Sequence, residues 1–333
     1  MSNDVRSLLQ SIGTPDFEYR EVAAVERWQA AAQRWPLFSA VNRTLLERIL
    51  QPPAVKAAQP ERKIHRAHCL AIIGLHGGSG RTTLTANLAQ ALVQNGRSAV
   101  AVEVDPQGGL PLHFGVEPDE PMGVFQPSLS PQAAAAWLSR FRSGPAVFPF
   151  GKLAGSLQAG LEAAVARDPL WLPRRLQAIV PPDCDFVLLD LPSASHPLWR
   201  SAIGIADSVV VALAPEAAAY ATLPQMEALL DECVPEPGRR AVRYLVNRFD
   251  ARRTFHRDLL ASLRGMMGPR AFSFAVHEDP VVGEALARRR LVVQEAADSQ
   301  VVAALGNLAD WLEDVAAQEA STRVRPVTTQ SAR

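Results

Sequence analysis

A glycine-dense loop between an apolar segment and a helix-forming segment is the feature that most restricts how this chain can fold. The apolar run Cys69–Gly74 leads, through Leu75, into His76-Gly77-Gly78-Ser79-Gly80-Arg81-Thr82-Thr83, and residues 82–94 favour a helix. Glycines let backbone N–H groups turn toward one anion, and the N-terminus of a helix adds partial positive charge at the same place. The segment therefore predicts a strand, a phosphate-binding loop and a helix. A glycine-rich turn without a ligand is the alternative, which the two threonines disfavour.

The loop departs from the common phosphate-loop pattern G-x-x-x-x-G-K-[ST] at one position. Gly74, Gly80 and Thr82 match the pattern, whereas Arg81 stands where the pattern has lysine. The Thr82 hydroxyl falls where such loops hold Mg²⁺. Arginine keeps the positive charge, but its planar guanidinium is not a compact ammonium group that reaches between phosphates.

Acidic residues end two further apolar segments. Glu103 and Asp105 lie at the end of Ala99–Val104, and Asp190 ends Asp185–Asp190. The carboxyl ends of parallel strands are where folds of this class bind ligands, so Glu103 and Asp105 are expected to face the loop and Asp190 to serve a metal ion. One acid at a strand end is often only a turn or helix cap, whereas three in this order are more specific.

Short apolar segments alternate with helical stretches from residue 69 onwards, which predicts a mainly parallel twisted sheet flanked by helices. The expected strands are Cys69–Gly74, Ala99–Val104, Ala146–Phe150, Asp185–Asp190, Ser208–Leu213, Arg243–Asn247 and Ala271–Phe274. The expected helices include Thr82–Gln94, Leu172–Ile179, Ala218–Glu232, Arg257–Met266, Val281–Arg289 and residues 298–315. We expect residues 1–50 to form a small helical module whose helix ends at Pro36. Residues 51–67 are expected to be a linker and residues 68–317 the main α/β domain. Residues 318–333 are expected to be a disordered tail.

Charge and cysteine content narrow the function classes. Lys+Arg and Asp+Glu both total 34 in the 333 residues, so a general affinity for polyanions is disfavoured and any basic site must be local. The three cysteines, Cys69, Cys184 and Cys233, are far apart, which favours a reduced cytoplasmic protein without a disulfide framework or a zinc site. No apolar run approaches eighteen residues and the N-terminus has no apolar leader, so membrane spanning and secretion are disfavoured.

Together, the loop and the carboxylates resemble the deviant-Walker-A ATPases of the MinD/ParA type, from about Cys69 to Trp311. In that family the loop reads K-G-G-x-G-K-[ST]-[ST] and the second strand ends D-x-D-P-Q-G; here the second motif is Glu103-Val104-Asp105-Pro106-Gln107-Gly108. The resemblance implies ATP and Mg²⁺ as ligands and a homodimer in which two nucleotide-bound subunits face each other. It implies that Asp105 orients the attacking water, Asp190 and Thr82 lie at the metal with Asp105 beside them, and Asn247 reads the adenine edge. The residues implied to bind the phosphates are Gly77, Gly78, Ser79, Gly80, Arg81, Thr82 and Thr83.

Both lysines of the family loop are replaced in this chain. His76 takes the position whose lysine crosses to the partner's phosphates in the family, and Arg81 takes the position of the second. A cation donated from the partner in this way is worth about 10³–10⁵ in rate, and a mostly neutral imidazole does not replace it. The expectation is ATP binding with weak ATPase activity or none.

Further segments resemble the BcsQ (YhjQ) branch of the family, which is associated with bacterial cellulose synthesis. They are Phe148-Pro149-Phe150-Gly151, Asn247-Arg248-Phe249-Asp250, and Val276-His277-Glu278-Asp279 with Glu284-Ala285-Leu286-Ala287. Phe17–Val22 and Ala30–Phe38 resemble the small protein BcsR, although this aromatic stripe is also what an N-terminal helix packed on its own domain would have. The resemblance implies a cytoplasmic regulatory or assembly factor for cellulose synthesis, recruited to the inner-membrane synthase through protein partners.

Three other functions compete with this one. A DNA-binding partition protein is suggested by twelve arginines against five acidic residues between Arg239 and Arg290, although a solvated ion-paired surface is the commoner explanation. A MinD-like membrane anchor is disfavoured because Asp298–Ala317 contains four acids and no Lys or Arg. An inert pseudo-ATPase, in which the nucleotide only holds a dimer together, differs from the favoured interpretation only in turnover.

Overall fold

The structure, a computed structural model, describes residues 22–49, 64–117, 120–126, 129–142, 144–153, 155–168, 170–192, 197–233 and 241–324. Its centre is a six-stranded sheet in the order β3-β2-β4-β1-β5-β6, and all five strand pairs are parallel. The fold class predicted from the sequence is confirmed. The strands are β1 (His68–Ile73), β2 (Ala99–Glu103), β3 (Ala146–Phe148), β4 (Phe186–Asp190), β5 (Ser208–Leu213) and β6 (Val242–Val246).

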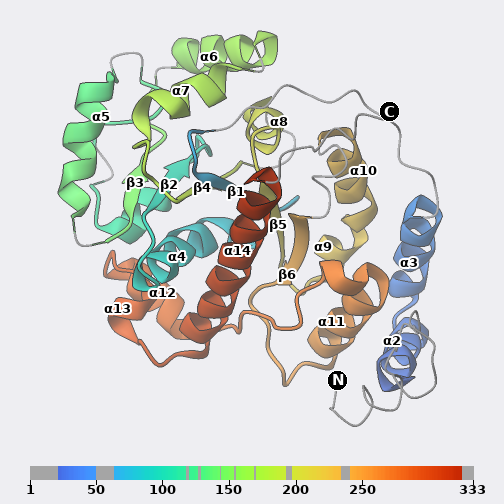
Figure 1. Cartoon of the computed structure of the whole chain (residues 1–333). Helices are drawn as coiled ribbons and strands as arrows, with labels where there is room; N and C mark the ends of the chain where they lie inside the picture. The colour runs from blue at the N-terminus through green and yellow to red at the C-terminus, as the bar shows by residue number, and fades with distance from the viewer. Residues whose placement is uncertain are drawn as a thin grey trace, which may run out of the picture.

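Continuous apolar strands are buried on both faces by helices, as a parallel sheet requires. Every residue of β1, β2, β4 and β5 is buried. The helices after the loop are α4 (Arg81–Gln94), α5 (Pro131–Leu138), α6 (Gly155–Arg167), α7 (Trp171–Ile179), α8 (Pro197–Ile203), α9 (Ala217–Ala221), α10 (Leu223–Cys233), α11 (Thr254–Met267), α12 (Pro280–Ala287), α13 (Val292–Glu295) and α14 (Gln300–Val324). The long C-terminal helix α14 crosses the sheet and packs along α4 (Figure 1). In the part of the chain with described structure, no helix combines the length and the apolarity that crossing a bilayer requires.

The strand register brings the predicted carboxylates to one edge of the sheet. Ile72 of β1 and Glu103 of β2 both pair with Asp190 of β4, and the backbone N–H groups of Val104 and Asp105 donate to the Asp190 carbonyl. The loop between β1 and α4 leaves the sheet at this same edge. The prediction that these acidic residues lie together with the loop is therefore confirmed for the backbone.

Three predicted elements differ from the structure near prolines or competing donors. The strand expected at Ala271–Phe274 is wrong: only a single bridge joins Tyr244 to Ala271, because the Arg264 guanidinium takes the carbonyls of Phe272 and Ser273. The strand expected to reach Phe150 ends at Phe148, because Pro149 has no N–H. The helix expected at Ala218–Glu232 is two helices, α9 and α10, with the break at Thr222 just before Leu223-Pro224.

Helix α14 continues to Val324, beyond the expected end at residue 315, so residues 318–324 are helical rather than a disordered tail. Residues 325–333 lie outside the described residues, as do residues 50–63, most of the expected linker. Residues 64–67 belong to the main domain, because Ile64 and Ala67 are each only 1% exposed.

In its described residues, 22–49, the N-terminal module has two helices, α2 (Val22–Arg34) and α3 (Pro36–Ile49). Pro36 ends the first helix, as expected, but it also begins a second one, where proline is well tolerated in the first turn. The two helices lie beside α10 and α11 (Figure 1). Residues 1–21 of the module lie outside the described residues.

An aromatic contact and a buried polar cluster fix the module on the main domain. Phe38 is fully buried, with its ring 4.6 Å from that of Tyr220 and 5.5 Å from that of Phe255. The Tyr220 hydroxyl donates to Asn42 Oδ1 at 2.7 Å and lies 2.6 Å from Ser262 Oγ. Burial of one such aromatic side chain contributes roughly 1.5–3 kcal/mol, so the module is an integral part of this fold.

Candidate nucleotide-binding site

Two glycines give the loop its shape. Gly78 and Gly80 have φ values of +79° and +82°, in the left-handed region where other residues are strained. A Cβ atom at Gly80 would also overlap the side-chain amide of Asn247. The backbone must therefore approach Asn247 closely here, and only glycine permits this at low cost.

Three side chains hold the carbonyl groups of the loop. Arg81 Nη1 donates to the carbonyls of His76 at 2.9 Å and Gly74 at 3.3 Å, and its Nε donates to the Leu191 carbonyl at 3.0 Å. Asn247 Nδ2 donates to the Ser79 carbonyl at 2.8 Å. Arg248 Nη1 donates to the Gly78 carbonyl at 3.3 Å. Four carbonyls of the loop region, those of Gly74, His76, Gly78 and Ser79, thus accept hydrogen bonds from side chains.

The N–H groups of the same loop are used differently. Among the described residues, no backbone N–H from Gly77 to Thr83 donates to another protein group. The first amides of α4 lack partners because the first N–H groups of any α-helix have no acceptor within the helix. The amides of the glycine loop lack acceptors as well, although they lie before the helix. Amides without acceptors, next to a helix N-terminus, are the chemistry of an anion-binding loop.

Asp190 provides a carboxylate suited to a metal at the base of the loop. It is 1% exposed, and its Oδ1 has no hydrogen-bond partner among the described residues. Burial raises the pKa of Asp190 to about 7, and the hydrogen bond from the Thr82 side chain opposes this shift. A buried carboxylate oxygen without a partner, beside a threonine hydroxyl, matches the oxygen ligands that Mg²⁺ prefers.

Asp105 lies at the open side of the same site. Its Oδ1 accepts from the Gln107 backbone N–H at 2.9 Å, and its Oδ2 is 3.8 Å from Arg81 Nη2. The Asp105 and Arg81 side chains are 15% and 12% exposed, so both are accessible without being solvated fully. The loop cation and the second-strand carboxylate therefore form one charged group.

Glu103 has a structural role, in contrast to the expectation that it faces the loop. It is 3% exposed and accepts from the backbone N–H groups of Leu110 at 2.8 Å and Phe150 at 2.9 Å. Burial raises its pKa, whereas these hydrogen bonds lower it. Glu103 thus ties β2 to the segment after Gly109 and to the end of β3, and both of its carboxylate oxygens accept from these backbone amides.

The remaining predicted residues have mixed positions. His76, Gly77 and Gly78 are exposed on the loop, and Ser79 is buried with an Oγ that has no partner among the described residues. Asn247 is buried against the loop, and its adenine-reading role stays a prediction. Two contributors were not predicted, Arg248 and the Leu191 carbonyl. Arg248 has φ +58° directly after Asn247, and no sequence pattern indicated that conformation.

The residues present fit a nucleotide and Mg²⁺. The orphaned oxygens of Asp190 and Ser79 and the unpartnered amides of Gly77–Thr83 offer ligands to a cation and donors to an anion, side by side. The Arg81 guanidinium balances part of the charge from within the loop.

Solved structures of similar fold include nucleotide complexes. Cobyrinic acid a,c-diamide synthase from Mycobacterium smegmatis with bound ADP and magnesium has a TM-score of 0.59 at 24% identity, covering 79% of this chain and 99% of that one. The cell division ATPase MinD from Pyrococcus furiosus has a TM-score of 0.58 at 23% identity, covering 75% and 99%. These likenesses support the fold.

Curated relatives have similar sequences over the main domain. The chromosome-partitioning ATPase Soj of Thermus thermophilus is 27% identical over 243 residues, covering 72% of this chain and 93% of the relative. A putative replication protein A of Rhizobium rhizogenes is 24% identical over 237 residues, and the match spans 65% of this chain but only 59% of that longer protein.

Two family models match directly. The model of the BcsR-like cellulose biosynthesis protein matches residues 1–41, and the model of the cellulose biosynthesis protein BcsQ matches residues 67–312. The second match covers most of the chain and contains every element of the site described above. The chain therefore belongs to the BcsQ family of cellulose biosynthesis proteins, a branch of the MinD/ParA-like P-loop ATPases.

Proposed function

We propose that this protein is an ATP-binding, dimeric regulatory or assembly factor for bacterial cellulose synthesis and secretion. It hydrolyses ATP slowly or not at all and works through protein partners at the inner-membrane synthase, to which these partners recruit it from the cytoplasm. The observation that carries the ATP-binding part is the loop itself, whose carbonyls are held by side chains while its amides lack acceptors. The family match supports the cellulose-related part.

Within this proposal each loop residue has a defined task. The amides of Gly77, Gly78, Ser79 and Gly80 and of the first turn of α4 bind the phosphates, and Thr82 and Asp190 hold the magnesium ion. Magnesium, when bound, neutralises phosphate charge. Asn247 and Arg248 hold the loop open by keeping its carbonyls away from the anion.

Slow turnover follows from the residues at the two lysine positions. The Arg81 guanidinium already donates to three carbonyls and lies near Asp105, so its positive charge is fixed beneath the loop. His76 is exposed and stands where a partner-directed cation is expected. Because charge neutralisation during phosphoryl transfer depends on cations that reach the transferring group, this arrangement favours binding over rapid hydrolysis. Asp105 remains the residue proposed to orient water.

The observed contacts do not favour the DNA-binding alternative. Arginines of the basic stretch pair with nearby acids: Arg252 and Arg253 with Asp250, Arg288 and Arg290 with Glu295, Arg289 with Glu117, and Arg270 with Glu227. Such pairs reduce the positive charge that could track nucleic-acid phosphates. Likewise Leu305, Leu308 and Leu312 of α14 are buried in the domain, which does not favour a membrane anchor on that helix.

Molecular mass in solution tests the ATP-dependent dimer. We expect nucleotide-free protein to elute as a monomer in gel filtration with light scattering, and Mg·ATP to shift it to a dimer. Gly80→Ala, which should weaken nucleotide binding at least tenfold, is the control that must stay monomeric at an Mg·ATP concentration just sufficient to dimerise the wild type. If the wild-type mass does not change and no nucleotide is retained, the proposal fails.

Single-turnover hydrolysis then separates a slow ATPase from a pseudo-ATPase. A slow ATPase predicts a wild-type rate above that of Asp105→Ala with equal nucleotide binding by both. Equal, near-zero rates would instead support a nucleotide that only holds the dimer together.

A further inference from the structure

The opposite end of the sheet from the phosphate loop carries a cluster of three side chains with metal-ligating atoms. His68 begins β1, Asp207 directly precedes β5, and Glu319 lies near the end of α14. One ligand atom from each lies within 4.8 Å of the others, and no other such group occurs in the described part of the chain. Since β1 spans six residues at about 3.3 Å each, the cluster is about 20 Å from the loop and forms no part of that site.

The His68 imidazole is oriented as a metal ligand would be. His68 is 6% exposed, and its Nε2 lies 2.8 Å from Ser208 Oγ. This contact leaves Nδ1 on the side of the Glu319 carboxylate. Metal-binding histidines commonly use their second ring nitrogen for such a contact, which fixes the ring.

The distance within the cluster suits a shared cation better than a hydrogen bond. His68 Nδ1 is 3.6 Å from Glu319 Oε2, which is longer than an ordinary hydrogen bond. Two ligands of one tetrahedral zinc ion, with bonds of about 2.1 Å, are roughly 3.4 Å apart. Very little movement of the Glu319 side chain would be needed for both atoms to bind the same ion.

The charges of the cluster also favour a cation. The Asp207 carboxylate is held in place by the Cys69 backbone N–H, which donates to its Oδ2 at 2.9 Å. Two carboxylates with ligand atoms within 4.8 Å of each other and of a histidine nitrogen are stabilised by a divalent ion.

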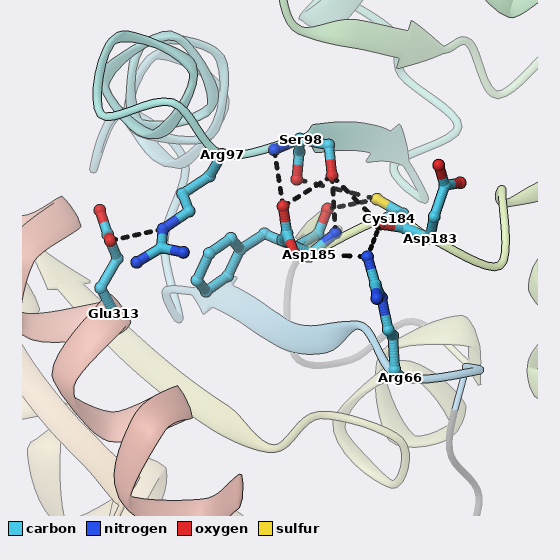
Figure 2. A network of polar contacts seen from close by, with 8 residues as sticks. Arg66, Arg97, Ser98, Asp183, Cys184, Asp185 and Glu313 are labelled. Atoms are coloured by element: carbon cyan, nitrogen blue, oxygen red, sulfur yellow. Dashed lines mark hydrogen bonds and ion pairs between the residues drawn. The ribbon is translucent and has the colours of Figure 1, made fainter.

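A cavity open to solvent gives access to the cluster. It has a volume of about 300 Å³, and both His68 and Glu319 line it. The neighbouring charged groups of the cavity are committed elsewhere: Arg97 pairs with Glu313 at 2.7 Å, and Arg66 donates to the Asp183 carbonyl at 2.6 Å (Figure 2). In the same view Asp185 accepts from the Ser98 hydroxyl at 2.9 Å. Because the cavity is lined by His68 and Glu319, water that enters it can reach the cluster and complete the coordination of a metal ion.

We propose that His68, Asp207 and Glu319 form a binding site for a divalent transition-metal ion of the zinc type, with a fourth position open to the cavity. One nitrogen and two carboxylate oxygens with an open position are a common ligand set for this class of ion. The bound ion cross-links the start of β1, the start of β5 and the C-terminal helix α14. This site is independent of nucleotide binding and of the proposed function.

Zinc binding to the full-length chain, freed of metals with a chelator, tests the proposal. Isothermal titration calorimetry with Zn²⁺ should give one equivalent for the wild type, and Co²⁺ should give the visible absorption of a four-coordinate site. Glu319→Gln should weaken zinc binding at least tenfold, because it removes a charged ligand while keeping the shape of the side chain, which is 32% exposed. Ser208→Ala should weaken it about tenfold through the His68 ring.

Glu313→Gln is the matched control. Glu313 lies on the same helix and lines the same cavity, but it accepts hydrogen bonds from Arg97 and Asn95 and should leave zinc affinity within twofold of wild type. Circular dichroism verifies that each variant is folded. The proposal is overturned if wild-type protein binds no zinc at 100 µM free ion, or if Glu319→Gln binds as tightly as wild type. It is also overturned if Asp190→Asn, and not Glu319→Gln, removes the bound ion, because zinc would then occupy the magnesium position.

Discussion

Replacing Arg81 with methionine should destabilise the nucleotide-free protein. Three hydrogen bonds from the guanidinium to the carbonyls of Leu191, Gly74 and His76 are lost, at 2.9–3.3 Å. At about 1 kcal/mol net for each bond, the free energy of unfolding should fall by about 3 kcal/mol. For a domain of this size, that corresponds to a decrease in Tm of roughly 6–12 °C, measured by thermal unfolding followed by circular dichroism.

Arg81 stabilises the loop through these hydrogen bonds in addition to supplying a positive charge. If Arg81 contacted only the phosphates of a bound nucleotide, its replacement would change the free energy of unfolding of the nucleotide-free protein by less than about 0.5 kcal/mol. Arg248→Met is the control, because Arg248 contacts the same loop but its side chain is 50% exposed, and it should cost under about 1 kcal/mol. An equal Tm for the two variants would show that Arg81 does not stabilise the nucleotide-free loop.

The Arg81→Lys variant tests whether the hydrogen bonds of the guanidinium, and not only its charge, stabilise the loop. A single ammonium cannot bridge the Leu191 carbonyl and the His76 carbonyl in the way that the guanidinium does. Arg81→Lys should therefore remain several degrees less stable than wild type, even though it restores the lysine of the common phosphate-loop pattern. Wild-type stability in Arg81→Lys would mean that charge alone matters.

Other predictions concern separate parts of the molecule. Gly80→Ala should lower ATP affinity at least tenfold in a binding titration, whereas Gly96→Ala, at a similar φ of +80° but with open space around it, should not. Phe38→Ala should cost about 3–5 kcal/mol of packing and speed amide hydrogen exchange in α2 and α3, with unchanged exchange in the central strands. Burial lowers the pKa of His113 to about 4. The unfolded chain then binds a proton below pH 6.5 that the folded chain does not, so stability should fall by up to about 3 kcal/mol between pH 6.5 and pH 4. In urea unfolding at both pH values, His113→Gln should lack that part of the loss; an unchanged pH slope would contradict the assignment.

The sequence was sufficient for the sheet and for the position of the site. Buried parallel strands have continuous apolar runs, and five of the six strands lie within one residue of their predicted bounds at both ends. The strand predicted at Ala271–Phe274 has the same composition, but a guanidinium from a neighbouring helix competes for its carbonyls. Such competition depends on tertiary structure and leaves no local pattern.

The tasks of individual side chains were harder to predict than their positions. The sequence places Glu103 and Asp105 two residues apart, yet one is buried against backbone amides and the other lies beside Arg81. The cysteine spacing led to the expectation of no zinc site, but the cluster proposed here contains no cysteine. Its members are separated by more than a hundred residues along the chain, and only the sheet and α14 bring them together.

The docked N-terminal module has a consequence for stoichiometry. Because α2 and α3 belong to the same polypeptide as the surface they cover, their local concentration there is on the order of millimolar whatever the expression level. A free subunit of the same size could be lost by dilution, or compete with other ligands for that surface. In this protein the ratio is fixed at one to one, and uncovering the surface requires a local conformational change instead of dissociation.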